Sequence, residues 1–85
     1  IILFPNFPNP FNPETTFSFN IGSLQQTSLR IYDIQGRLIE TLVDDKINPG
    51  FHTISWNASK VATGVYFVKL ISGEKIKTQK IMVLK

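Results

Sequence analysis

Residues 16–21 read Thr-Phe-Ser-Phe-Asn-Ile, so that polar and apolar side chains alternate strictly along the chain. Because successive side chains of a β-strand point to opposite faces, this alternation predicts a strand with one buried face. The same period of two returns in three other segments, and two further strands are expected with less regular patterns. These segments are residues 28–32, 51–56 and 66–71, followed by 37–43 and 75–84.

Turn-forming residues separate these segments at short intervals. Gly36 ends the tight connection 33–36, where it can adopt a positive φ, and Pro49 fixes φ in the turn 48–50. Short strands with turns about every eight to twelve residues are typical of a β-sandwich, and we expect no helix of ordinary length. The sequence therefore predicts an all-β, immunoglobulin-like antiparallel sandwich of about seven strands. Residues 81–84, apolar on both faces, indicate a bulge or deeper burial near the C-terminus.

The chain has 85 residues, no cysteine and 42% hydrophobic residues. This length suffices for one small core, so we expect a single domain spanning residues 1–85. Nearly every apolar side chain must be buried in so small a core, which leaves little room for a catalytic cleft. No apolar run exceeds four residues, so no membrane insertion is expected. A chain that begins Ile-Ile-Leu-Phe is expected to be a piece of a longer protein.

Residues 1–13 form an opening segment that is rich in proline and asparagine. Its prolines fix φ and remove backbone donors, so the segment cannot be a central strand. Asparagine recurs at every third position from residue 6 to residue 12, which favours an extended, polyproline-like path. We expect Phe7 and Phe11 to anchor this strap against the sandwich edge, so that it closes one end of the fold.

Positive charge is concentrated at the C-terminus. The formal net charge is +3, yet residues 69–85 alone carry five lysines and one glutamate. A basic segment can indicate a nucleic acid or an anionic surface as the partner. No aromatic residue lies among Lys75, Lys77 and Lys80 to stack on a base, so no nucleic acid partner is expected. We interpret these lysines as the wet face or edge of a strand, where they oppose aggregation.

Residues that could carry catalysis or bind a metal are few and isolated. His52 is the only histidine and shares a strand face with Trp56, so it is interpreted as a partly buried packing residue. Asp44 and Asp45 are too few carboxylates for a calcium site and are expected in a solvated turn. Asn57 begins a glycosylation sequon, but its place after a strand favours a turn. The sequence thus predicts no enzyme, no metal and no cofactor.

The aromatic residues are expected to build the fold. Trp56 is placed at the centre of the core, in contact with both sheets. Tyr32 and Tyr66 are expected to be half-buried, with their hydroxyl groups reaching water or backbone. Phe51 and Phe67 are interpreted as packing residues of the sandwich.

Five segments carry recognisable motifs in a fixed order. Residues 7–19 begin Phe-Pro-Asn-Pro-Phe-Asn-Pro-Glu-Thr, and residues 31–39 read Ile-Tyr-Asp-Ile-Gln-Gly-Arg-Leu-Ile. Residues 50–57 contain Gly-Phe-His and Trp-Asn, residues 63–70 contain Thr-Gly-Val-Tyr-Phe, and residues 80–85 form a basic, apolar ending. Together they closely resemble the Por-type (type IX) secretion C-terminal sorting domain, type A, with Phe7 where that family has Tyr. The motifs also resemble the immunoglobulin-like domain of flagellar hook-capping proteins.

The resemblance implies a non-catalytic C-terminal module that directs an exported bacterial protein through the outer-membrane type IX translocon. It further implies a sortase-like peptidase that removes the domain by cutting upstream of it, and an N-terminal cargo domain in the same parent chain. The implied route runs through the periplasm to the cell surface or the medium. We expect the domain to be a monomer.

The terminal strand is expected to be the segment that the translocon reads, by strand addition and by lysine contacts to an acidic surface. The recognition residues predicted on this basis are Lys77, Lys80, Ile81, Met82, Val83, Leu84 and Lys85. The other motif residues are expected to build the fold that displays this strand. They are Pro8, Asn9, Pro10, Phe11, Asn12, Tyr32, Asp33, Gly36, Arg37, Gly50, Trp56, Gly64 and Tyr66.

An alternative is an immunoglobulin-like spacer or carbohydrate-binding module appended to a secreted enzyme. A planar row of exposed aromatic rings would favour that alternative. Phe51 and Phe67 are the residues that could supply such a row.

Overall fold

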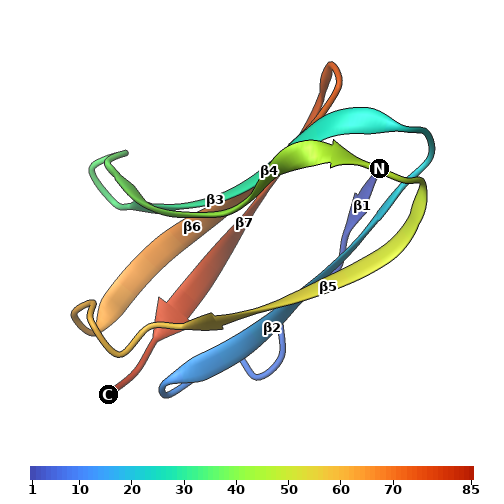
Figure 1. Ribbon diagram of the computed structural model, residues 1–85. Coiled ribbons are helices and arrows are strands. Elements are labelled where there is room, and N and C mark those ends of the chain that lie inside the picture. Colours follow the sequence, from blue (N-terminus) through green and yellow to red (C-terminus); the bar gives the residue numbers. More distant parts are fainter.

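A computed structural model describes residues 1–85 as seven strands in two antiparallel sheets that pack face to face (Figure 1). One sheet has the order β1-β2-β5, formed by β1 (Ile2–Leu3), β2 (Glu14–Ile21) and β5 (Gly50–Asn57). The other has the order β4-β3-β6-β7, formed by β3 (Gln25–Asp33), β4 (Leu38–Ile47), β6 (Gly64–Ser72) and β7 (Lys75–Val83). The predicted all-β antiparallel sandwich is confirmed. No helix long and apolar enough to cross a membrane is present.

The alternating pattern of the sequence produces the buried core. In β2, Phe17, Phe19 and Ile21 are fully buried, whereas the residues between them are partly exposed. The facing sheet supplies buried aliphatic side chains at every second position, which are Leu29 and Ile31 from β3 and Val68 and Leu70 from β6. Strands β2, β3 and β6 thus bury one face against the other sheet, as a period of two requires, whereas β4 has no fully buried residue.

Trp56 joins the two sheets at one end of this core. Its side chain is 2% exposed, and its ring lies edge-on to Phe11 at 5.8 Å and to Tyr66 at 6.3 Å between centroids. The indole Nε1 donates a hydrogen bond of 3.2 Å to Oε1 of Glu40. Trp56 belongs to β5, whereas Tyr66 and Glu40 belong to the other sheet, so its predicted contact with both sheets is confirmed.

Strand β4 differs from the expectation. Asp44 and Asp45 were expected in a turn, but both lie inside β4, where they pair with Ser28 and Thr27 of β3. The expectation was wrong because cross-strand pairing continues to Ile47, which the charged residues do not interrupt. Neighbouring strand residues point to opposite faces, so these two carboxylates do not converge.

The expected bulge near the C-terminus is also absent, since β6 and β7 pair without a register shift. The register shifts lie instead between β3 and β4, at Leu29/Arg30 and Ile31/Tyr32. The deeper burial expected from apolar residues on both faces is also wrong, because only one face is buried. Ile81 and Val83 are at most 1% exposed, whereas Met82 is partly exposed and Leu84 is 54% exposed.

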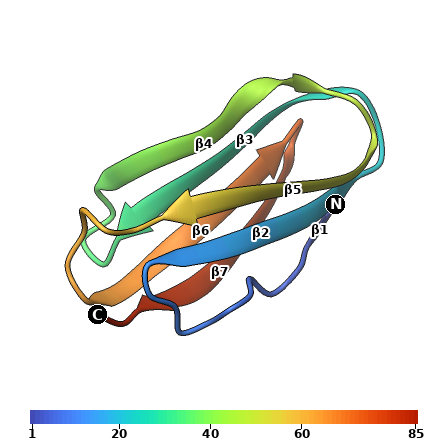
Figure 2. The same cartoon turned by 60° about the horizontal axis from the view of Figure 1, so that its bottom comes forward.

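The two long sides of the sandwich are closed to different extents. Figures 1 and 2 show that the N-terminal strap runs beside β2 and reaches the end of β7, which covers one side. On the other side, β4 and β5 are the edges of different sheets and share no backbone hydrogen bond. The strap therefore covers the β7 side, whereas the β4/β5 side is an opening that the side-chain hydrogen bond between Trp56 and Glu40 bridges at one end.

Replacement of Trp56 by alanine tests the importance of this core. A large-to-small change at a fully buried aromatic residue costs about 3–5 kcal/mol of unfolding free energy. That is a large share of the roughly 5–15 kcal/mol typical of a small domain. We expect Trp56→Ala to lower the chemical denaturation midpoint sharply or to unfold the domain. A loss below about 1 kcal/mol would show that the indole is not part of the core.

Candidate functional site

Strand β7 is a basic edge strand. It ends the four-stranded sheet and pairs only with β6. Lys75, Lys77 and Lys80 are all exposed, and none of them forms an ion pair. The interpretation of these lysines as solvent-exposed residues of an edge strand is therefore confirmed. Lysine at such a position discourages uncontrolled pairing with other strands.

The backbone of β7 offers unused hydrogen-bonding groups along half of its length. Met82 and Leu84 bond outward, away from β6, and every second residue of a strand directs its backbone to the same side. The N–H and C=O groups of Ile76, Thr78 and Lys80 therefore also face outward, where no strand pairs with them. This free edge, residues 76–80, is flanked by the exposed lysines.

The other half of the β7 edge is already occupied by the strap. The N–H of Phe11 donates to the carbonyl of Met82 at 3.2 Å, and the N–H of Leu84 donates to the carbonyl of Phe11 at 3.0 Å. The Asn9 Oδ1 accepts a further bond of 3.1 Å from the N–H of Met82. A partner strand could pair with residues 82–84 only after displacing these contacts.

The strap is held at its base by buried polar contacts. Asn6 is 4% exposed, and its Nδ2 donates to Oγ1 of Thr15 at 3.0 Å. The hydroxyl of Thr15 donates in turn to the carbonyl of Pro8 at 2.8 Å. The Gln79 carboxamide of β7 lies 2.9 Å from the Asn6 side chain, so this network also joins the strap to β7.

Two phenylalanines were expected to anchor the strap, and the prediction is correct for one of them. Phe11 is 3% exposed and packs on Trp56, as predicted, but Phe7 is 81% exposed. The backbone of Phe7 pairs with Thr16 of β2, and its ring is left at the surface. The polyproline-like path is also wrong, because the chain bends at residues 8–10 and 12–13, on either side of the bridge at Phe11.

The predicted recognition residues fall into two groups in the folded domain. Ile81 and Val83 are buried in the core, so a partner cannot contact their side chains without unfolding the strand. The residues with accessible side chains are Lys77, Lys80, Leu84 and Lys85, with Met82 partly exposed. Lys85 is tied to the domain, because its Nζ donates to the carbonyl of Ser59 and its N–H to Oγ1 of Thr63.

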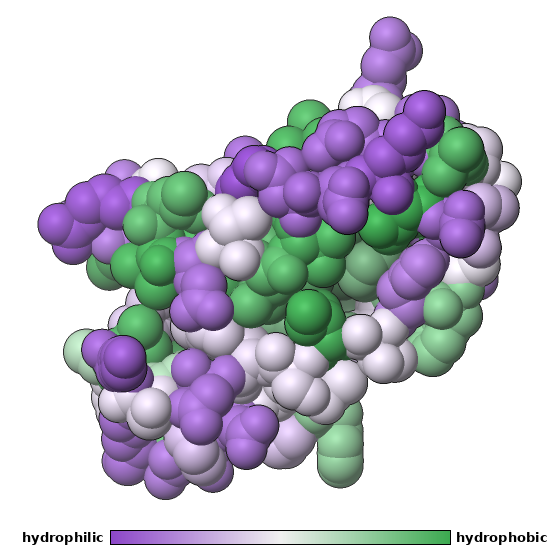
Figure 3. Space-filling model, viewed as in Figure 1, coloured by the Kyte–Doolittle hydropathy of each residue, from purple (hydrophilic) through white to green (hydrophobic).

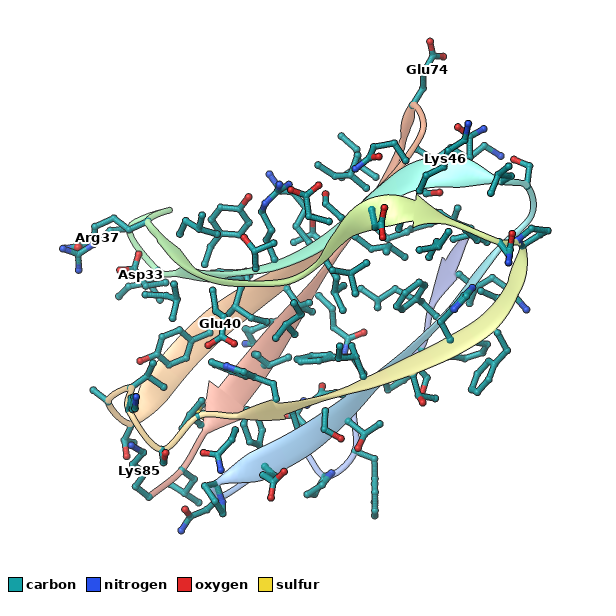
Figure 4. All side chains as sticks on the ribbon, viewed as in Figure 1. Asp33, Arg37, Glu40, Lys46, Glu74 and Lys85 are labelled. Atoms are coloured by element: carbon teal, nitrogen blue, oxygen red, sulfur yellow. The ribbon has the colours of Figure 1, made fainter.

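The motif residues of the β3–β4 connection form a tight, charged turn (Figure 4). The Oδ1 of Asp33 accepts bonds of 2.9 Å from the N–H groups of Gln35 and Arg37, and its Oδ2 lies 2.8 Å from Nε of Arg37. Gly36 has a φ of 82°, which a residue with a side chain rarely adopts. The backbone N–H of Arg37 is the main cause that lowers the pKa of Asp33, assisted by the guanidinium group and the N–H of Gln35. The motif therefore builds a rigid turn.

Other motif residues also have structural roles. The hydroxyl of Tyr66 donates to the carbonyl of Ala62 at 2.7 Å, which fixes the loop before β6. Lys69 lies with its Nζ 5.2 Å above the ring of the half-buried Tyr32. Gly50 has a φ of 124° where the turn enters β5.

Of the isolated polar candidates, His52 and Asn57 take the structural roles expected for them. His52 is partly buried and stacks on Phe19 at 5.4 Å, and its Nε2 lies 2.8 Å from the carbonyl of Asn48. The Oδ1 of Asn57 accepts the N–H of Ser59 at 2.9 Å, which makes the predicted turn. Nowhere do three or more His, Cys, Asp or Glu side chains gather as metal ligands would.

Phe51 differs from its expected role as a packing residue, because it is 62% exposed. It lies on the outer face of the three-stranded sheet, where its aromatic neighbour is Phe4. Their ring planes meet at 60°, so they do not form the planar row that a sugar-binding surface would need. Phe67 is partly buried, in agreement with its packing role.

The fold and its surface define a small β-sandwich module whose distinctive feature is a basic edge strand. The chain matches the model of the secretion system C-terminal sorting domain over residues 6–84, and it belongs to that family. Domains of this family are sorting signals of type IX secretion, which are recognised by the type IX machinery and are generally non-catalytic. The protein that carries the domain is therefore secreted or displayed at the cell surface.

The fold is also found in a solved structure. A chain from a study of PorZ, described as an essential bacterial surface component of the type-IX secretion system of Porphyromonas gingivalis, superposes with a TM-score of 0.70. The two are 23% identical, and the alignment covers 98% of this chain but 11% of that one. At this identity the likeness establishes the fold. No curated protein matches the chain.

Replacement of Asp33 by asparagine tests the charged turn through its pH dependence. The folded turn lowers the pKa of Asp33 below the ordinary value of 3.8, so the ionised carboxylate stabilises the fold above that pH. This contribution is lost as the pH falls through the lowered pKa of the folded state. We therefore expect Asp33→Asn to be less stable than the unmodified domain at neutral pH. The difference should shrink in urea titrations below pH 3.8. A difference that stays constant down to low pH would show that the charge of Asp33 has no role.

Proposed function

We propose that the type IX machinery recognises this domain by the free edge of β7 and its lysines. The single observation that supports this is the combination, on one strand, of outward backbone groups at residues 76–80 and exposed lysines without partners. A partner strand with acidic side chains could pair with this backbone and contact Lys77 and Lys80. Ile81 and Val83 then serve to anchor the strand in the core.

The proposed route places the domain as one unit, residues 1–85, behind an N-terminal cargo in the same chain. The folded domain would direct the cargo from the periplasm through the outer-membrane translocon. A sortase-like peptidase would then cut upstream of the domain. Both termini lie at the surface of the sandwich, so a cargo can be attached without disturbing the core (Figures 1 and 2).

Charge reversal on the free edge tests the proposal. Lys77→Glu combined with Lys80→Glu replaces two exposed residues that form no ion pair, so stability should change by less than about 0.5 kcal/mol per site. An acidic receptor would repel the new charges. With a periplasmic reporter fused before residues 1–85 in a bacterium that has a type IX system, we expect the exported fraction to fall at least tenfold. The unmodified fusion should export its reporter.

The matched control is Lys46→Glu combined with Lys60→Glu, which changes the net charge equally on residues outside β7. Both control lysines are exposed, and Lys46 lies on β4 (Figure 4). We expect this variant to be exported normally. Equal loss of export in both variants would point to net charge and contradict recognition of β7. Retention of the unmodified fusion in the periplasm would overturn the sorting route itself.

A further inference from the structure

The domain has four sheet edges, and three of them carry features that oppose unspecific pairing with another strand, although the backbone of residues 76–80 of β7 is itself unpaired. Strand β1 is two residues long, β4 carries two register shifts and several charged residues, and β7 carries lysines and is half covered by the strap. Short strands, bulges, charges and covering segments are the usual protections of sheet edges. Strand β5 has none of them, since residues 50–57 contain no proline and no Asp, Glu, Lys or Arg.

The backbone of β5 is available along its whole outer edge. In β2, the backbone of Thr16 and Ser18 bonds toward the strap, so the odd-numbered residues of β2 bond toward β5. Their partners on β5 are the even-numbered residues, and the N–H and C=O groups of the odd-numbered residues face outward. These residues are Phe51, Thr53, Ser55 and Asn57, all of which are exposed.

An apolar strip lies beside this free edge, in the opening between the two sheets. Leu42, Val43 and Ile47 from β4 and Ile54 from β5 pack against the core but are only partly buried. In Figure 3, which has the view of Figure 1, apolar surface is visible between β4 and β5. The core is therefore incompletely covered on the side where β5 also has unpaired backbone groups.

Two carboxylates border the same opening. On β4, Glu40 lies directly opposite Ile31 of β3, and Asp45 lies directly opposite Thr27 of β3. Ile31 and Thr27 are fully buried, and directly opposed residues share a face of the sheet, so Glu40 and Asp45 lie on the inner face of β4. Glu40 points into the opening (Figure 4), where it accepts the Trp56 hydrogen bond. Both residues are exposed, and neither forms an ion pair.

We infer that the β4/β5 opening is a second recognition surface, which binds an extended segment of a protein of the secretion machinery as an added strand on β5. The outward N–H and C=O groups of β5 belong to four residues spaced about 7 Å apart. Only an extended chain can pair with all of them, so the expected occupant is a strand. Contact with the apolar strip requires a partner segment with an apolar side chain at every second position. The carboxylates of Glu40 and Asp45 favour Lys or Arg in the part of the partner that lies next to them. The inference rests on the proposed function for the nature of the partner.

The first test replaces Thr53 with proline. The N–H of Thr53 faces outward, so proline removes an edge donor and blocks strand addition without breaking a bond to β2. Thr53→Val keeps the donor and is the matched control. In the reporter assay described above, we expect Thr53→Pro to lower the exported fraction at least tenfold and Thr53→Val to leave it unchanged. Circular dichroism and melting of purified residues 1–85 should show both variants folded.

A second variant keeps the inference testable if Thr53→Pro does not fold. Asp45→Lys reverses an exposed charge beside the opening and would repel the basic residues of the partner. Glu74→Lys makes the same charge change at the tip of the β6–β7 hairpin, far from the opening (Figure 4). We expect reduced export for Asp45→Lys and normal export for Glu74→Lys. Normal export of both the Thr53→Pro and Asp45→Lys variants, with normal export of the unmodified fusion, would overturn the second surface and leave the β7 proposal intact.

Photo-crosslinking identifies the occupant. Benzoylphenylalanine in place of the exposed Phe51 tests β5, and in place of the exposed Phe7 it provides the control. During export we expect position 51, and not position 7, to form a crosslink to a type IX component that is lost with Thr53→Pro. The crosslinked peptide should alternate apolar and polar residues. A crosslinked dimer of the domain would assign the β5 edge to a second copy and overturn the inference, as would a crosslink that survives Thr53→Pro.

Discussion

The edge-on contact between Phe11 and Trp56 ties the strap to both sheets at one end of the molecule. Phe11 bonds through its backbone to β7, while its ring reaches Trp56 of β5, which in turn contacts Tyr66 and Glu40 of the other sheet. A domain of 85 residues buries little more surface than it needs to offset its conformational entropy. One aromatic pair that joins three parts of the chain therefore has a large influence on the stability of the whole.

This arrangement divides the terminal strand into a buried part and an accessible part. Ile81 and Val83 complete the core, so the last strand cannot leave the sandwich without exposing it. The strap covers the backbone of residues 82–84, and the lysines and free backbone of residues 76–80 remain accessible. A partner that reads β7 in the folded domain is thus restricted to the half nearest the β6–β7 turn. The residues that anchor the strand in the core are therefore different from the residues that are accessible to a partner.

Much of the fold could be predicted from the sequence, because strands with one buried face leave a period of two that is independent of distant contacts. The turn at Gly36 and the burial of Trp56 against both sheets followed from local chemistry in the same way, although Trp56 lies at one end of the core and not at its centre. The errors concern residues whose environment is set by distant segments. Phe7 and Phe11 occupy similar positions in a proline-rich segment whose apolar residues show no strand or helix periodicity, so the sequence does not tell which ring enters the core. Asp44 and Asp45 remain in a strand because β3 pairs with them, which no local pattern records.

The candidate surfaces were predictable to different degrees for the same reason. The lysines of β7 are visible as a run of charge, and their location at an edge follows from their density. The opening beside β5 has no such signal, because it is distinguished by the absence of charged residues and proline from β5. An uncharged strand with alternating polar and apolar residues has the same sequence pattern at an edge as in the centre of a sheet. Only the strand order shows that β5 has no neighbour. An edge without protection is a hazard for any exported protein that must stay unaggregated in transit. Its absence of charge, next to three edges that are protected, is therefore best explained by a partner that covers it.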